Sequence, residues 1–91
     1  PDYATVWRNL GIGYYNILGQ PEKAKECYER AYRLAPDDAR LLFERDLLWK
    51  RLGLPASERL AALEKHLPQV RRRDDLSVEY SDLLNQVGRH E

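Results

Sequence analysis

Apolar residues recur along the chain every three or four positions, which is the spacing of one face of an α-helix. In the first segment these positions are Trp7, Leu10, Tyr14 and Leu18, and Gly19 follows where a helix would end. Similar segments return four more times along the chain. The pattern therefore predicts an all-α fold with five helices, near residues 3–18, 21–34, 38–52, 55–67 and 75–87.

Proline and aspartate mark the expected ends of these helices. Pro21 suits the first turn of the second helix, and Pro36 disfavours its continuation. Pro68 should end or kink the fourth helix, although Val70 continues its apolar pattern and a kinked extension toward residue 72 stays open. Aspartate side chains can accept hydrogen bonds from free helix N–H groups, so we expect caps at Asp2, at Asp37 or Asp38, and at Asp74 or Asp75.

The chain also repeats itself. A Leu-Gly or Val-Gly pair ends at Gly19, Gly53 and Gly88, with spacings of 34 and then 35 residues. The apolar positions upstream of each pair correspond as well. One domain of 91 residues is therefore expected to hold repeat 1 at about 3–36, repeat 2 at about 37–73 and a half repeat 3 at about 74–91.

Residues 7–36 resemble a tetratricopeptide repeat, with one extra residue between Tyr14 and Ala24. The matching positions are Trp7, Leu10, Gly11, Tyr14, Ala24, Tyr28, Ala31 and Pro36. The resemblance implies a tetratricopeptide-like α-α superhelix of about two and a half helix-turn-helix repeats. It also implies a scaffold that binds other proteins. A fainter likeness is to repeat regions that follow a β-rich domain in some large bacterial proteins.

The second repeat departs from the first when the two are aligned on their Leu-Gly pairs. Gly11 and Gly13 indicate a close approach by another helix, yet Arg45 takes the place of Gly11, and Glu58 that of Ala24. An inward Arg45 would need a carboxylate partner because an unpaired buried charge is costly. The candidates are Glu44, Asp46 and Glu79.

The C-terminal helix has no second helix after it in this sequence. We therefore expect Leu83, Leu84 and Val87 to expose an apolar face that favours a homo-oligomer through this helix. The chain begins at Pro1 and contains no Met, so we expect a fragment of a longer, bacterial protein.

Composition narrows the function. Fifteen basic and fifteen acidic side chains cancel, which argues against nucleic-acid or membrane binding, and no apolar run is long enough to span a bilayer. The single cysteine, Cys27, indicates a reducing compartment, so we expect the cytoplasm. Cys27, His66 and His90 lack metal-site spacing, and the glycines lack a phosphate-loop context. No metal, cofactor or enzymatic activity is expected.

In the tetratricopeptide family, the first helices of the repeats line a concave groove. By resemblance, the groove candidates here are Arg8, Ile12, Tyr15, Asn16, Asp46, Trp49, Lys50, Ser77, Ser81 and Asn85. Aromatic and polar side chains of this kind suit a protein or peptide partner. The alternative is a structural or oligomerisation appendage that packs on an adjacent catalytic domain of the parent protein.

Overall fold

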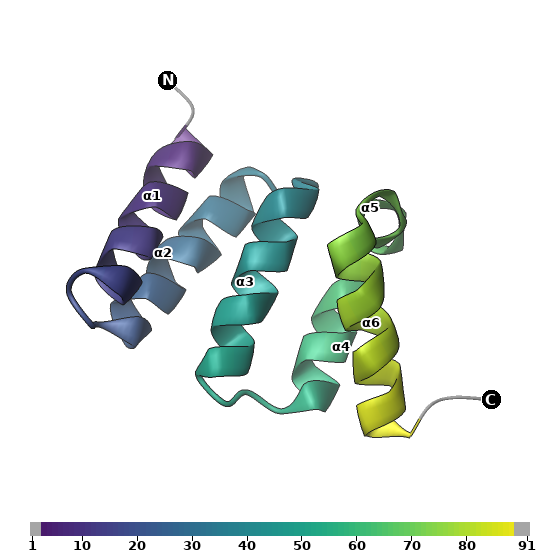
Figure 1. Ribbon diagram of the computed structural model, residues 1–91. Coiled ribbons are helices and arrows are strands. Elements are labelled where there is room, and N and C mark those ends of the chain that lie inside the picture. The colour runs from purple at the N-terminus through teal and green to yellow at the C-terminus, as the bar shows by residue number, and fades with distance from the viewer. Residues whose placement is uncertain (1–2, 89–91) are drawn as a thin grey trace.

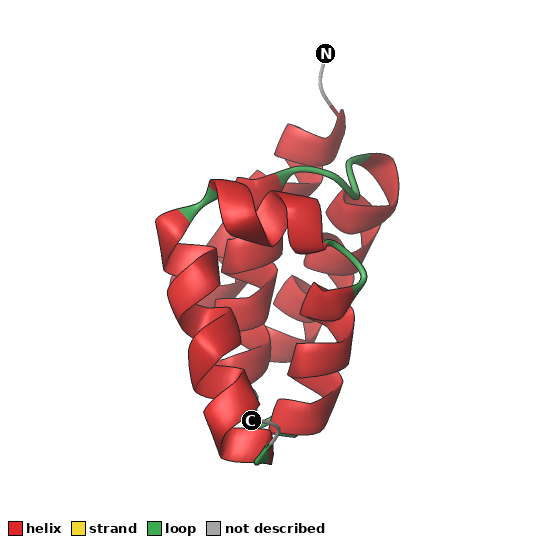
Figure 2. Cartoon of the chain, turned by 90° about the vertical axis from the view of Figure 1, so that its right-hand side faces the viewer, coloured by secondary structure: helices red, strands yellow, loops and turns green. Residues whose placement is uncertain are grey.

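The computed structural model describes residues 3–88 and shows two layers of helices, with no strand among those residues. Asp2, a predicted helix cap, and His90 lie outside this range. The first layer holds α1, α3 and α6, the second holds α2 and α4, and the short α5 crosses one end (Figures 1 and 2). The helices are α1 Tyr3–Asn16, α2 Pro21–Leu34, α3 Ala39–Arg51, α4 Ala56–Glu64, α5 Leu67–Arg72 and α6 Asp74–Val87.

The helix pair α1–α2 forms as the sequence predicts. Gly19 takes a left-handed conformation (φ 62°) in the turn, and Pro21 is the first residue of α2. The apolar face of α2 is buried through Ala24, Cys27, Tyr28 and Ala31. The small side chains among them, Ala24, Cys27 and Ala31, let α1 pack along α2 more closely than α3 packs on α4.

The two helical glycines play different roles. A Cβ atom on Gly11 would lie 2.8 Å from two ring carbons of Tyr28 and 3.4 Å from the backbone oxygen of Ala24, so the expected close approach is confirmed there. At Gly13 no other helix of the described residues 3–88 comes within 4 Å of the added Cβ, and the same expectation is wrong.

This contrast predicts opposite effects for one substitution. Gly11→Ala should destabilise the chain by about 1–2 kcal/mol, because crowding against the buried Tyr28 outweighs the gain in helix propensity. Gly13→Ala has only the gain and should stabilise by up to about 1 kcal/mol. Urea unfolding followed by circular dichroism measures both. Equal shifts in both variants would show that α1 and α2 do not touch at Gly11.

Aspartate capping occurs once among the predicted places in the described chain. The Asp38 carboxylate accepts a hydrogen bond from the Leu41 N–H at 3.1 Å, at the start of α3. Neither Asp74 nor Asp75 is the N-cap residue, since both lie inside the first turn of α6, after Arg73, but the Asp75 carboxylate does accept a hydrogen bond from the free Leu76 N–H at 2.8 Å. There the Asp75 carboxylate accepts from the Arg73 guanidinium at 2.8 Å, and both aspartates favour the positive helix end.

The expected fourth helix is in fact two helices, so the count is six rather than five. Helix α4 ends at Glu64, four residues before Pro68, whose ring would clash with that carbonyl in a continuous helix. Pro68 instead lies in the first turn of α5. The extension toward residue 72 therefore exists as a separate helix, and it buries Val70.

Arg45 is buried, at 5% exposed, but none of its three candidate partners binds it. Its guanidinium lies 3.4 Å from the Glu29 carboxylate of α2 and stacks over the rings of Tyr32 and Trp49 at 3.8 and 4.5 Å. The Tyr32 hydroxyl is 2.6 Å from His66 Nε2. Burial, and then the charge of Arg45, lower the pKa of His66. This cluster joins the two repeats.

The C-terminal helix is packed rather than open. Leu83 is fully buried, and Leu84 and Val87 pack against the same core cluster, so the expected apolar face is wrong. The reason is α5, which together with α4 covers the inner side of α6. Most of the exposed large apolar side chains lie at the other end of the array, on α1 and beside it: Tyr3, Val6, Leu10, Ile17, Leu18 and Leu34.

Candidate binding groove

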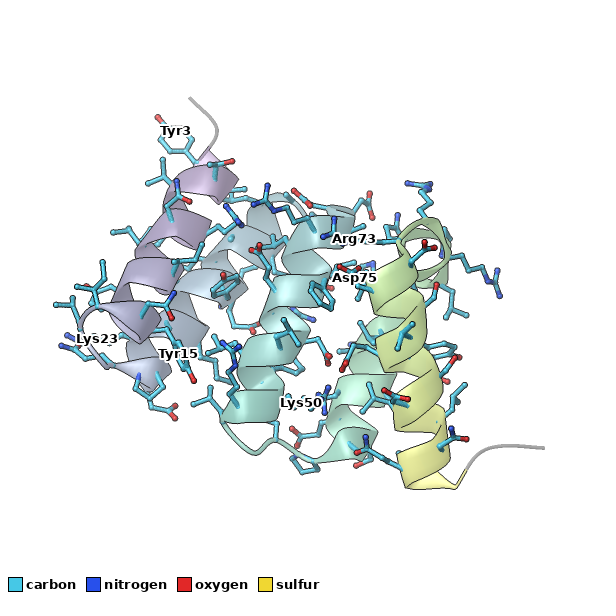
Figure 3. All side chains as sticks on the ribbon, in the orientation of Figure 1. Tyr3, Tyr15, Lys23, Lys50, Arg73 and Asp75 are labelled. Carbon is cyan, nitrogen blue, oxygen red and sulfur yellow. The ribbon has the colours of Figure 1, made fainter. Side chains whose placement is uncertain are left out.

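A groove runs between α1 and α3 on the layer formed by the first helices of the repeats. It holds a cavity of about 200 Å³ that Tyr15 helps to line, and Tyr15 lies between the two helices (Figure 3). One wall comes from α1, the other from α3, and Tyr28 of α2 contributes to the floor. The lining residues are Ile12, Tyr15, Asn16, Tyr28, Glu44, Leu47, Leu48 and Arg51.

An ion pair joins the two walls. The Arg8 guanidinium donates two hydrogen bonds to the Glu44 carboxylate, one of them at 2.7 Å from Nη2, and Arg40 approaches the same carboxylate at 3.3 Å. The hydrogen bond to Glu44 is the main reason that the pKa of Arg8 is raised. Burial alone would raise the pKa of Glu44, but the hydrogen bonds and charges of both arginines lower it.

The buried hydroxyl of Tyr28 lies behind this pair. It donates a hydrogen bond to Glu44 at 3.4 Å, and burial followed by the charge of Glu44 raises the pKa of Tyr28 to about 12. Glu44 therefore meets two cations and one hydroxyl, and its charge is neutralised within the chain. The groove edge at Arg8 and Glu44 is a structural bridge between α1 and α3.

The residues predicted on α1 come together at this groove. Ile12, Tyr15 and Asn16 line the cavity, and Arg8 forms its ion-paired edge. The Tyr15 ring also lies 5.5 Å below the guanidinium of Arg51. The structure thus gathers four of the predicted side chains in one place, on the side of α1 that faces α3.

The residues predicted on α3 and α6 do not join them. Asp46 is only 3% exposed, so its predicted outward position is wrong. Trp49 points toward α2, where its indole N–H donates to Glu29 at 3.1 Å, and Lys50 pairs with Glu79 of α6 at 3.8 Å. On α6, the Ser77 hydroxyl donates to the Val70 carbonyl, while Ser81 and Asn85 are exposed away from the cavity.

Neither a metal site nor a membrane span is present in the part of the chain that the structure describes. Within residues 3–88, no group of three or more His, Cys, Asp and Glu side chains could hold a metal ion. None of the described helices combines the length and the apolar character that crossing a bilayer requires.

Comparison with known proteins identifies the family. The tetratricopeptide repeat pattern matches residues 4–38, which are α1, α2 and the turn that follows. The α1–α2 pair, with the turn after it, belongs to the tetratricopeptide repeat family. Repeats of this family are generally protein-interaction modules and are generally not catalytic.

A longer protein is similar in sequence to most of this chain. The Protein O-mannosyl-transferase TMTC1 of Mus musculus is 38% identical over 74 residues, which are 81% of this chain and 6% of that protein. The chain therefore spans a small part of that relative's length. No solved structure matches the chain at a significant level.

The helix pairs α1–α2 and α3–α4 correspond at 35 residues, one more than the Leu-Gly pairs indicate. The extra residue in the turn after α1 shifts the register, so Ile12 and Asn16 correspond to Leu47 and Arg51, the two residues that face them across the groove. The prediction missed Leu47 and Arg51 for this reason, whereas Glu44 and Leu48 correspond to Asn9 and Gly13, which were not predicted in the groove. The extra residue between Tyr14 and Ala24 was the signal that could have placed Leu47 and Arg51.

The same register explains a buried ion network between α3, α4 and α6. Asp46 and Arg59 stand 35 residues after Gly11 and Ala24, the small residues at the close α1–α2 contact. Arg59, at 4% exposed, donates to Asp46 at 3.0 and 2.8 Å and to Glu79 at 3.0 Å. Glu58, expected at this place, is exposed instead.

Burial opposes the charge of Arg59, but its hydrogen bonds and the charges of Asp46 and Glu79 outweigh burial and raise its pKa. Lys50 extends the network to the surface through Glu79. In the helix pair α3–α4, the ion pairs of Arg59 with Asp46 and Glu79 therefore replace the contact between small residues. Because Glu79 lies on α6, these ion pairs also connect α6 to this helix pair.

Proposed function

We propose that this tetratricopeptide chain is a protein-interaction scaffold whose groove between α1 and α3 binds a peptide segment of a partner protein. The observation that supports this most directly is the open cavity between the two helices. Its walls combine apolar side chains from Ile12, Leu47 and Leu48 with polar ends from Asn16 and Arg51. Such a mixture allows an apolar anchor to be buried while nearby polar groups fix its orientation.

The charges of the groove favour one kind of peptide. Glu44 is neutralised by Arg8 and Arg40, whereas Arg51 forms no ion pair with any residue of the described chain 3–88. Arg51 only covers the Tyr15 ring, so its donors remain available to a carboxylate. We therefore propose an apolar side chain next to an acidic one as the recognised feature, with the apolar group between Ile12 and Leu47.

A peptide selection tests this proposal. Soluble peptides would be selected from a random library on the intact chain and their affinities measured by fluorescence anisotropy. Leu47→Asp and Arg51→Glu should each weaken binding at least about tenfold, which is about 1.4 kcal/mol. Leu34→Asp and Arg33→Glu introduce the same changes at exposed places on α2 and should leave binding unchanged.

The result can go against the groove in two ways. If the selected peptides bind Leu47→Asp and Arg51→Glu as tightly as the parent chain, the groove is not the binding site. If they carry no acidic residue and only Leu47→Asp matters, the role given to Arg51 is wrong. Circular dichroism of each variant separates lost binding from lost folding, since all four positions keep some exposure to solvent.

The same proposal treats the chain as a non-enzyme that acts in the cytoplasm. Cys27 supports both parts, because it is a free, buried thiol on the inner face of α2. Burial, and then the charge of Glu26, raise the pKa of this thiol, so it stays protonated and is a poor nucleophile. A labelled antibody against the parent protein in fractionated cells would test the location.

A further inference from the structure

The outer side of α1 carries an apolar face. Val6 and Leu10 are 47% and 46% exposed, Ile17 directly after the helix is 81% exposed, and Gly13 lies between the last two. These positions follow one another at spacings of three or four residues, so they lie on one side of the helix. Helix α1 also lies at one end of the array (Figure 1). These four positions form the α1 end face.

The corresponding face of α3 is covered by another helix of the chain. At the spacing of 35 residues between the two helix pairs, the α1 end face corresponds to Leu41, Arg45, Leu48 and Leu52. The first three are buried. Helix α2 lies against them, since Tyr28 and Ala31 share a core cluster with the two buried leucines and the Arg45 guanidinium stacks over the Tyr32 ring at 3.8 Å. The second helix of one pair therefore covers this side of the first helix of the next pair.

The sequence ahead of α1 matches the connection that leads from α2 to α3. That connection ends in Pro-Asp-Asp-Ala at residues 36–39, after α2 has ended at Leu34 and where α3 begins at Ala39. Residues 1–4 are Pro-Asp-Tyr-Ala, so three of the four residues are identical at the same spacing of 35. Such a match favours a second helix of the same kind ahead of these residues.

We propose that the α1 end face binds one further helix with the chemistry of α2. This further helix is the second helix of another pair and precedes Pro1 in the parent protein. Its apolar side lies along α1 as that of α2 lies along α3, and it buries Val6, Leu10 and Ile17. Burial of these exposed apolar side chains drives the contact. The faces of α1 and α3 differ at two positions, and each difference describes the further helix.

The first difference is charge. The buried guanidinium of Arg45 requires a carboxylate, and Glu29 of α2 supplies it at 3.4 Å. The α1 end face has Leu10 at this position, and the one charged residue of α1, Arg8, is already paired with Glu44. A carboxylate on the further helix would be buried here without a cation of α1. We therefore expect an apolar residue on the further helix where α2 has Glu29.

The second difference is size. Helix α3 has Leu48 where α1 has Gly13, and a shallow hollow of about 300 Å³ lies at this glycine. No other helix of residues 3–88 comes within 4 Å of a Cβ atom added to Gly13. The hollow is lined by Asn9, Leu10, Gly13, Tyr14, Ile17 and Leu18. We therefore expect the further helix to insert a large apolar side chain, a leucine or a phenylalanine, where α2 leaves room for Leu48.

A tandem chain tests the proposal. In it, residues 1–38 are followed directly by residues 4–91, so the added α2 precedes the original α1 at the spacing that separates α2 from α3. Glu29→Leu in the added α2 removes the carboxylate that Leu10 cannot match. The added pair should stack on the α1 end face and raise the urea midpoint by at least about 0.5 M relative to the unmodified 91-residue chain. Circular dichroism measures both transitions.

The same substitution at two places in the tandem chain supplies a matched control. Leu10→Asp in the original α1 lies under the added α2 and should abolish the gain in midpoint. Leu10→Asp in the added α1 lies on the free end of the array and should keep most of the gain. Gly13→Leu should raise the midpoint more in the original α1, where the added α2 has room for it, than in the added α1.

Two results would overturn the proposal. The first is a tandem chain with the urea midpoint of the unmodified chain, and the second is an equal loss for Leu10→Asp in both α1 helices. Sedimentation velocity then identifies the other occupant. If the tandem chain gains nothing, and the unmodified chain forms a dimer that Leu10→Asp abolishes, the α1 end face binds a second copy of the chain instead.

Discussion

Replacing Arg59 with methionine should lower the free energy of unfolding by about 3–5 kcal/mol. Arg59 is 4% exposed and Asp46 is 3% exposed, and the two hydrogen bonds between them are 3.0 and 2.8 Å long. Methionine fills much of the same volume but leaves the Asp46 carboxylate buried without a cation. The loss is therefore the cost of an uncompensated buried charge, which exceeds the net value of the pair itself.

Urea unfolding of the parent chain and the Arg59→Met variant measures this effect, and two further variants separate its causes. Arg30→Met removes an exposed ion pair with Glu26, whose side chains are 47% and 65% exposed, and should cost no more than about 0.5 kcal/mol. Asp46→Ala combined with Arg59→Met removes both charges. The double variant should lose at least about 2 kcal/mol less than the sum of the single variants. Additive losses would mean that the two charges do not depend on each other.

The ion network also shows why part of this fold could not be predicted. From sequence alone, a charged residue is expected at the surface unless its partners are known. Asp46, Arg59 and Glu79 come from three helices that are far apart in sequence. Only the three-dimensional packing brings them together. The alignment on Leu-Gly pairs placed Glu58 at this position instead, because Pro21 is the first residue of α2 whereas Pro55 precedes α4, which begins at Ala56.

Local signals, in contrast, were sufficient for the first repeat. The α1–α2 hairpin depends on an apolar period, a glycine turn and Pro21 at a helix start, all within one short stretch. Ile12, Tyr15 and Asn16, placed on the groove side of α1 by resemblance to the family, line the cavity, and their role in binding stays a prediction. To predict the α3 wall, the two repeats had to be aligned correctly. One residue in the turn after α1 decides that alignment, so the α3 wall was missed.

The sequence predicted an exposed apolar face on the C-terminal helix, whereas the structure buries Leu83. The Leu83→Ala variant tests this difference through the free energy of unfolding. Leu83 has no exposed surface. It packs together with Leu60 of α4, Val70 of α5 and Leu76 of α6 in one core cluster. Its truncation should cost about 2–5 kcal/mol, because the lost transfer energy adds to that of the cavity. For a chain of this length the melting temperature should fall by at least about 8 °C.

Val78→Ala on the same helix is the control, because Val78 is 59% exposed and its change should stay within about 0.5 kcal/mol. Thermal unfolding followed by circular dichroism compares the two variants with the parent chain. If no other helix covered the apolar side of α6, both substitutions would lower the free energy of unfolding by a similarly small amount. A large loss for Leu83→Ala alone would mean that α4 and α5 cover the apolar side of α6.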